Sequence, residues 1–190
     1  MKWKNQSDTA ERKLLAKHIS PPVSDIVIQT NMKSINLFAE AIVKACGVKM
    51  KKEGSENAGI EVVKNFWSSK NVNLTGFVME DACGLSRKNK ISTRQLAEML
   101  RVLTKEKSYK AFRRSLPVAG QSGGMASMLK NTVAEKNLIA KTGNMDQIKS
   151  YAGYVTNASG KELAFALVFN NYSCNNAALK QKAEKLLLLI

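Results

Sequence analysis

Lys141, Thr142 and Gly143 place a cation, a hydroxyl and a residue without a side chain at consecutive positions. They follow two apolar residues and precede a polar turn, a pattern typical of an edge strand whose lysine faces a cleft. Such a lysine can hold positive charge near an anionic ligand group. By itself the triplet is weak support, because a specified tripeptide occurs by chance in roughly one chain of this size in twenty or thirty. Its significance depends on Ser34 and Asn36, far upstream, which add a hydroxyl and an amide.

The chain has few of the residues that a zinc site or a Ser-His-Asp triad would need. His18 is the single histidine, and the three cysteines show no metal-ligand spacing: Cys46, Cys83 and Cys174. A zinc site and a Ser-His-Asp triad both need more histidines or a closer cysteine pattern. We therefore expect no metal and no cofactor.

Length and composition indicate a globular chain. With 190 residues, 44% of them hydrophobic and 24% charged, the chain can form one domain with a real core. No apolar run approaches the ~20 residues of a membrane span. The first residues, "MKWKNQSDTAERK", carry charges and no hydrophobic signal core, so no signal peptide is expected in them.

The net charge is strongly positive. Thirty Lys and Arg against fifteen Asp and Glu give +15, which would favour any polyanion. The lysines are spread along the chain, however, with no basic block or aromatic-basic motif. A solvated lysine-rich surface is the favoured interpretation, and we expect no dedicated nucleic-acid binding.

The first two thirds of the chain carry patterns that favour helices. Ser24 is predicted to cap a short helix through Met32, and a second helix is predicted to start after a tight connection at Ser34 to Asn36 and to end at Gly47. Its apolar residues share one face and are expected to point inward: Leu37, Phe38, Ala41, Ile42 and Ala45.

Further elements follow in the middle of the chain. Gly54-Ser55 opens a helix, and "GFVMEDACGLS" predicts a short strand running into a turn. Ser92 and Gln95 form a capping box before another helix. A short helix over 108–116 leads into the glycine-rich loop "PVAGQSGGM".

In the last third of the chain, the pattern of apolar residues changes from one typical of helices to one typical of strands. Residues 138–142, 150–156 and 162–169 are rich in branched and aromatic side chains and are separated by turns, which predicts an antiparallel meander. We expect a single α+β domain over 1–190, with the helical part at about 24–131, strands at about 137–170 and a C-terminal helix at about 175–189 packed on the sheet.

The order of several segments resembles one family. "SPPVSDIV", "TNMKSINLFAE", "DACGLSRKN", "LPVAG", "AKTG" and "AGYVTNASGKELAFALVFNN" look like the C-terminal part of the low-molecular-mass class C penicillin-binding proteins, from about residue 9 to residue 172. These proteins are D-alanyl-D-alanine carboxypeptidases and endopeptidases of the serine β-lactamase-like superfamily. Ser34-Ile35-Asn36 and Lys141-Thr142-Gly143 match the second and third boxes of their active site. The resemblance implies the C-terminal part of a β-lactamase/transpeptidase-like domain.

The resemblance also implies roles for these residues. Ser34 would relay a proton to the leaving amine and be linked to Lys141. Asn36 would hydrogen-bond the substrate amide and the catalytic lysine. A substrate would lie antiparallel to the strand of the third box, as an added strand would.

The resemblance also implies roles for Thr142, Gly143 and Asn144, which would line the other wall of the site. The Thr142 hydroxyl would bind the substrate carboxylate, and Gly143 would let the substrate backbone come close. The backbone N–H of Asn144 would be one of two oxyanion donors, each typically worth ~3 to 4 kcal/mol of barrier.

Two local departures from the family are visible. Asn144 stands where the family usually has Ser or Thr, whose hydroxyl also grips the carboxylate. Ala82-Cys83 stands where the family often has Gly-Ser, and we interpret this as a packing variation with Cys83 as a small, buried, unreactive residue.

The family's first box, Ser-x-x-Lys, does not precede Ser34. The chain has one such match, Ser127 to Lys130, which falls after the other landmarks where a helix turn is expected, and a helix surface is the favoured interpretation. We therefore predict that this chain alone is inactive, while the parent protein acts on peptidoglycan stem peptides, binds β-lactams and works in the periplasm or otherwise outside the cytoplasmic membrane. A truncated chain, one part of a split protein and a catalytically dead module remain open.

Two other functions remain as alternatives. One is a nonenzymatic module that binds peptidoglycan or a partner through the same cleft, and the other, resting on charge alone, is a basic nucleic-acid binder. Apolar faces exposed by an absent N-terminal half would also favour self-association.

Overall fold

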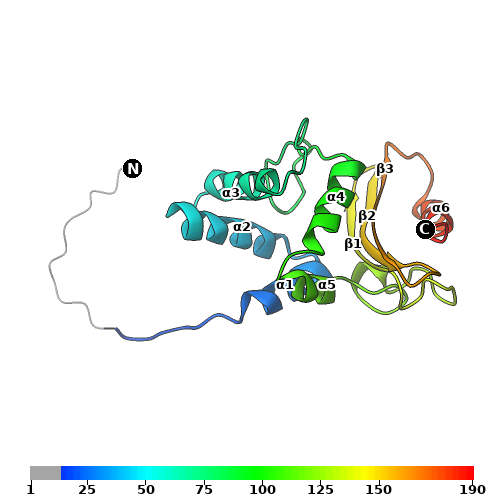
Figure 1. The fold of residues 1–190 in the computed structure, drawn as a ribbon, viewed down its shortest axis with the longest axis horizontal. Coiled ribbons are helices and arrows are strands. Elements are labelled where there is room, and N and C mark those ends of the chain that lie inside the picture. The colour runs from blue at the N-terminus through cyan, green and yellow to red at the C-terminus, as the bar shows by residue number, and fades with distance from the viewer. Residues whose placement is uncertain (1–13) are drawn as a thin grey trace.

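The computed structural model describes residues 14–190, so the charged N-terminal segment discussed above lies outside the described residues. Helices come first and strands follow (Figure 1), which confirms the predicted α+β order. The elements are α1 (Val23–Lys33), α2 (Asn36–Lys51), α3 (Glu56–Ser69), α4 (Thr93–Leu103), α5 (Tyr109–Ser115), the 3-10 turn η1 (Gly123–Met125), β1 (Ile139–Met145), β2 (Ile148–Thr156), β3 (Glu162–Asn170) and α6 (Asn176–Leu187).

The three strands form the predicted antiparallel meander in the order β1-β2-β3. Residues facing each other across β1 and β2 include Lys141 with Ala152, Gly143 with Ser150 and Asn144 with Lys149. Because side chains alternate along a strand, Thr142 and Asn144 lie on one face of β1, and Lys141 and Gly143 lie on the other.

Each face of the sheet is covered by helices, with α4 on one side and α6 on the other (Figure 1). On the α4 side, Ile139 and Tyr154 pack with Leu100 and Leu116, and the Tyr154 hydroxyl donates to the carbonyl of Leu100 at 2.8 Å. On the α6 side, a larger cluster joins the sheet to α6 and to the loop before β1: Met125, Leu129, Tyr151, Val155, Phe165, Ala183 and Leu187. The lysine triplet is therefore built on a strand held from both sides.

Helices α2 and α3 form an antiparallel pair with closely approaching backbones. A Cβ atom on Gly59 would lie 2.0 Å from the carbonyl oxygen of Val43, and one on Gly47 would lie 3.0 Å from the Gly59 nitrogen. The prediction that Gly47 ends α2 is wrong, since the helix continues to Lys51. Gly47 is a packing residue rather than a stop signal.

Two further local predictions are wrong. Pro22 occupies the cap position of α1, and Ser24 lies inside the helix, because proline is well suited to the start of a helix. The expected inner face of α2 is also misplaced. Leu37 is 73% exposed, while Val43 and Gly47 are buried against α3.

Several end signals are confirmed. Ser92 and Gln95 form the predicted capping box at α4, Ser55 accepts a hydrogen bond from the Ala58 N–H at the start of α3, and Asn175 caps α6. The strand predicted in "GFVMEDACGLS" reduces to a single bridge between Val78 and Lys90. Within residues 14–190, no helix combines the length and the apolar composition needed to cross a membrane.

Candidate active site

Ser34 occupies the tight connection between α1 and α2. It is the C-cap residue of α1 and has φ 52° and ψ 50°, the left-handed region that side chains other than glycine rarely adopt. A strained backbone at a non-glycine residue is often found at functional sites. Seven other described non-glycine residues also have a positive φ, so this conformation supports Ser34 as a candidate only together with its contact to Lys141.

Helix α1 is fixed to the rest of the chain through α5. The amide of Asn31, one turn before Ser34, donates to the hydroxyl of Ser115 at 2.6 Å. The chain then runs from α5 to Pro117, whose carbonyl accepts from the Ala140 N–H of β1 at 2.9 Å. These contacts connect the Ser34 turn to the strand that carries Lys141.

Lys141 reaches across to this turn. Its Nζ lies 2.5 Å from the Ser34 hydroxyl oxygen and donates to the carbonyl of Thr142 at 2.7 Å. Ser34 and Lys141 are 107 residues apart in sequence. Burial lowers the pKa of Lys141, and the nearby positive charge of Lys149 lowers it further. The lysine is thus easier to deprotonate than an exposed one.

The outer edge of β1 is open beyond Ala140. Backbone amides alternate in direction along a strand, and the Ala140 N–H points outward to Pro117. The N–H groups of Thr142 and Asn144 therefore point the same way, and neither has a backbone partner among residues 14–190. An extended peptide could pair with this edge.

One glycine within the triplet and one next to it sit where a side chain would clash. A Cβ on Gly143 would lie 2.3 Å from the hydroxyl of Ser150, so the close approach of β2 already favours glycine at this position. A Cβ on Gly124 would lie 2.2 Å from the Thr142 hydroxyl. The glycine-rich loop thus packs directly against Thr142, a contact that the sequence did not indicate.

Asn36 and Asn144 are less closely tied to the lysine. Asn36 is the exposed first residue of α2, and its side chain makes no hydrogen bond with another described residue. The Asn144 side-chain oxygen accepts a long hydrogen bond of 3.4 Å from Lys149. Lys149 was missed by sequence reasoning, since only the register of β1 and β2 reveals its position.

The Ser-x-x-Lys match at Ser127 is not on a helix. The segment forms turns, with Leu129 at φ 59°, so the predicted helix turn there is wrong. Ser127 and Lys130 are both exposed. Their surface position agrees with the expectation that this match is not a nucleophile box.

The loop around Cys83 is held by carboxylates. Glu40 of α2 accepts backbone hydrogen bonds from Ala82 and Cys83 at 2.9 and 2.8 Å, and Asp81 accepts one from Gly84 at 2.7 Å. Glu40, Asp81 and Cys83 are close enough to meet at one ion, but both carboxylates already serve the loop backbone. Burial raises the pKa of the Cys83 thiol, which disfavours the reactive thiolate.

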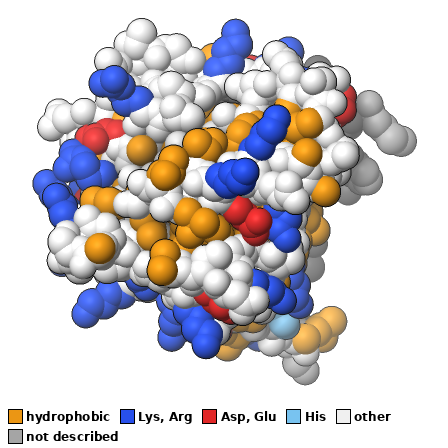
Figure 2. All heavy atoms as spheres, turned by 90° about the vertical axis from the view of Figure 1, so that its right-hand side faces the viewer, with side chains coloured by type: hydrophobic (Ala, Val, Ile, Leu, Met, Phe, Trp, Pro, Cys, Tyr) orange, Lys and Arg blue, Asp and Glu red, His pale blue; other side chains and the backbone are white. Residues whose placement is uncertain are grey.

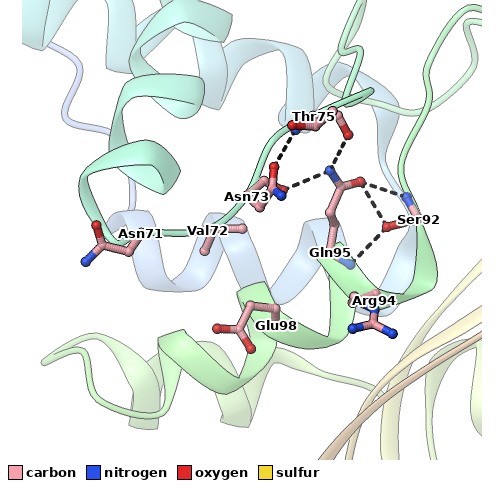
Figure 3. Close-up of a pocket in the computed structure, with 8 residues that line it drawn as sticks. All are labelled: Asn71, Val72, Asn73, Thr75, Ser92, Arg94, Gln95 and Glu98. Atoms are coloured by element: carbon pink, nitrogen blue, oxygen red, sulfur yellow. Dashed lines mark hydrogen bonds between the residues drawn. The ribbon is translucent and has the colours of Figure 1, made fainter.

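A cavity of about 460 Å³, which none of the candidate-site residues lines, lies between the start of α4 and the 71–75 segment (Figure 3). The Gln95 amide points into this junction and donates to the carbonyls of Asn73 and Thr75 at 2.9 and 3.0 Å. Its polar groups bond one another, so we interpret the cavity as a structural joint.

Basic side chains are scattered on the molecular surface. Figure 2 shows Lys and Arg distributed across the face that carries α6, around apolar side chains near its centre. No single basic stripe is visible on this face, in agreement with a solvated lysine-rich surface.

A meander covered by helices on both faces, with a serine turn facing an edge-strand lysine, defines the class of the protein. It is the C-terminal part of a β-lactamase-like domain. Residues 2–189 match the D-Ala-D-Ala carboxypeptidase 3 (S13) family, and the chain belongs to that family. The resemblance seen in the sequence is thereby confirmed.

Curated relatives carry matching names. The D-alanyl-D-alanine carboxypeptidase DacB of Haemophilus influenzae is 30% identical over 172 residues, 89% of this chain and 36% of that protein. The D-alanyl-D-alanine carboxypeptidase of an Actinomadura species is 33% identical over 172 residues, 88% of this chain and 32% of that protein. The chain therefore spans about a third of the length of these relatives.

Solved structures agree with the fold. Penicillin binding protein 4 of Haemophilus influenzae, crystallised with a β-lactam, superposes with a TM-score of 0.86 at 28% identity over 94% of this chain and 43% of that chain. The TLA-3 extended-spectrum β-lactamase, at 16% identity, has a TM-score of 0.63 over 87% of this chain and 64% of that chain, which shows the fold alone. The β-lactamase-like fold expected from the sequence is confirmed.

Proposed function

We propose that the chain supplies two walls of an acyl-transfer site for peptides ending in D-alanyl-D-alanine. The observation that carries the proposal is the contact between the Lys141 ammonium and the Ser34 hydroxyl, 2.5 Å long and formed by residues 107 positions apart. The chain's family and the names of its relatives give the substrate class.

The lysine and the serine would together move a proton. A buried amine whose pKa is lowered can exchange a proton with a neighbouring hydroxyl more readily than an exposed lysine can. In the proposed reaction Ser34 passes a proton to the leaving amine, Lys141 sets the charge around that hydroxyl, and Asn36 holds the substrate amide.

The open edge of β1 would bind the substrate backbone. A peptide added antiparallel to β1 would meet the outward N–H groups of Thr142 and Asn144. The Asn144 N–H would stabilise the oxyanion of the tetrahedral intermediate, and the Thr142 hydroxyl would take part in binding the carboxylate.

The nucleophile would come from outside this chain. In the parent protein we propose a Ser-x-x-Lys serine that forms an acyl-enzyme with peptidoglycan stem peptides and with β-lactams, outside the cytoplasmic membrane. The chain alone is then inactive. Incubated with a labelled penicillin it should form no stable adduct, and an adduct mapped to Ser127 by mass spectrometry would contradict this assignment.

Binding tests the proposal directly. A peptide ending in D-Ala-D-Ala, titrated into the isotope-labelled chain, should shift the amide resonances of Thr142 and Asn144, since these groups receive its backbone. Lys141→Met should weaken this binding, whereas Lys161→Met, at the exposed β2–β3 turn, should leave it unchanged. Shifts confined to other parts of the chain would contradict the proposal.

A further inference from the structure

A second cavity of about 300 Å³ adjoins the end of β1. It lies between β1 and β2, the loop after η1 and the first turn of α6. All four elements contribute polar side chains to its lining: Ser127, Asn144, Lys149, Tyr151, Asn176 and Lys180. The cavity is contiguous with the candidate site because Asn144 belongs to both.

The cavity is positively charged. It is lined by two lysines and by no carboxylate. Lys180 is engaged, since it donates to the carbonyl of Ser127 at 2.7 Å and lies 4.0 Å from Glu184. Lys149 forms no ion pair within residues 14–190, and its single hydrogen bond is the 3.4 Å contact with Asn144. Its ammonium retains donors for an anion.

The sheet register aims Lys149 at the substrate strand. Lys149 faces Asn144 directly across β1 and β2, so both side chains lie on the same face of the sheet as the Thr142 hydroxyl. The outward N–H of Asn144 opens onto the adjoining edge. A carboxylate that approaches Thr142 and Asn144 from the open edge therefore comes within the field of Lys149.

An anion bound here would also reduce the repulsion between the positive charges of Lys149 and Lys141. Lys149 is partly buried, which lowers its pKa, and its charge acts on Lys141 across the strand. Two partly buried cations without a carboxylate beside them favour a negatively charged ligand.

We propose that Lys149 is a specificity-determining residue that binds the free C-terminal carboxylate of a peptide lying on β1. This inference rests on the proposed function and adds to it the residue that discriminates: through Lys149, peptides with a free terminal carboxylate are preferred over those whose terminus is amidated or cross-linked. Lys149 thereby takes over anion binding at the edge where Asn144 offers only an amide.

The test compares two ligands that differ in one group. An acetylated peptide ending in D-Ala-D-Ala is titrated as the free acid and as the C-terminal amide, and affinities are read from the amide shifts of Thr142 and Asn144. The unaltered chain should bind the acid about tenfold more tightly, as expected for one charge-assisted hydrogen bond. Lys149→Met should reduce this preference several-fold, leaving the part that the Thr142 hydroxyl contributes, Lys149→Arg should retain it, and Lys182→Met on the exposed side of α6 should not alter it.

The outcomes separate the two ideas. If acid and amide bind equally to the unaltered chain, or if Lys149→Met keeps the full preference, the role of Lys149 is overturned while the proposed function stands. If neither peptide shifts Thr142 or Asn144 in any variant, both are overturned. Circular dichroism checks that each variant is folded, and Lys149→Gln, which keeps a polar side chain without the charge, replaces Lys149→Met if that variant does not fold.

Discussion

At the scale of single residues, Ser34 combines a reactive hydroxyl with an uncommon backbone conformation. Its positive φ holds the hydroxyl at the turn where Lys141 arrives. Such a conformation costs roughly 1 kcal/mol or more for a residue with a Cβ. The fold therefore gives up some stability at the residue that the proposed chemistry needs.

Two substitutions separate the strain from the hydroxyl. Ser34→Ala and Ser34→Gly both remove the contact with Lys141, but only glycine adopts the left-handed conformation without steric cost. We expect the glycine variant to be about 1 kcal/mol more stable than the alanine variant in urea denaturation. In the parent protein both should lose most carboxypeptidase activity. A glycine variant less stable than the alanine variant would show that the turn is not strained.

The pKa of Lys141 should respond to Lys149. Burial is the main cause of its lowered pKa and would persist in Lys149→Met, but the repulsion between the two cations would disappear. We expect the Lys141 pKa to move upward in this variant, toward its ordinary value. An NMR titration of the labelled Lys141 amine measures it, with Lys161→Met as control; an unchanged pKa would contradict the proximity of the two charges.

The same shift affects stability. A lysine with a folded-state pKa below its unfolded value holds fewer protons when folded, so the free energy of unfolding rises with pH through that window, up to the ordinary value of 10.5. We expect this rise to be smaller in Lys149→Met. Melting temperatures recorded on the alkaline side of neutrality would show the difference.

At the scale of elements, the sequence located most helices and all three strands. Branched and aromatic runs marked β1, β2 and β3, and the Ser92 capping box marked α4, because these signals depend on neighbouring residues. Gly47 was misread because helix termination and close helix packing use the same residue. The choice between them depends on α3, which no local pattern reveals.

The candidate site was likewise predictable only where the signal is local in the sequence. Ser34 and Lys141 were found through their family resemblance, whereas Lys149 and Gly124 were not found at all. Their roles arise from strand register and from a loop packed against Thr142. Such contacts form only when distant segments meet, so their residue types carry no local signature.

At the α2–α3 contact, close packing and helix propensity predict opposite changes in stability when a glycine is replaced by alanine. Gly→Ala in an exposed helix interior stabilises by up to about 1 kcal/mol. At Gly59 the new Cβ would meet the Val43 carbonyl at 2.0 Å, so we expect Gly59→Ala to destabilise the fold by about 1 to 3 kcal/mol. Urea denaturation measures the change, and a stabilised variant would disprove the close approach.

At the scale of the whole molecule, high positive charge is combined with an exposed apolar stripe on α2. The stripe consists of Leu37, Ala41 and Ala45, which the sequence had placed inside, together with Val48. Charge repulsion opposes association at low salt and is screened at high salt. We therefore predict that the chain self-associates and does so more strongly as salt is raised.

Sedimentation velocity at several protein and salt concentrations would measure this association. Leu37→Glu should reduce it, whereas Val133→Glu, at an exposed loop position outside the stripe, should not. A chain that remains monomeric in high salt would contradict the prediction. Duplex DNA binding that persists at ~150 mM salt would instead revive the nucleic-acid alternative.

The long separation between Ser34 and Lys141 has a consequence for synthesis. At about 5 to 20 residues per second, Ser34 is made roughly 5 to 20 s before its partner lysine. During that interval α2 to α5 are made without the sheet that fixes them. The α1–α5 contact at Asn31 and Ser115 can hold the serine turn only after Ser115 has been made. On the ribosome the contact between Ser34 and Lys141 therefore forms late, and a nascent chain arrested before Lys141 should display the helices without it.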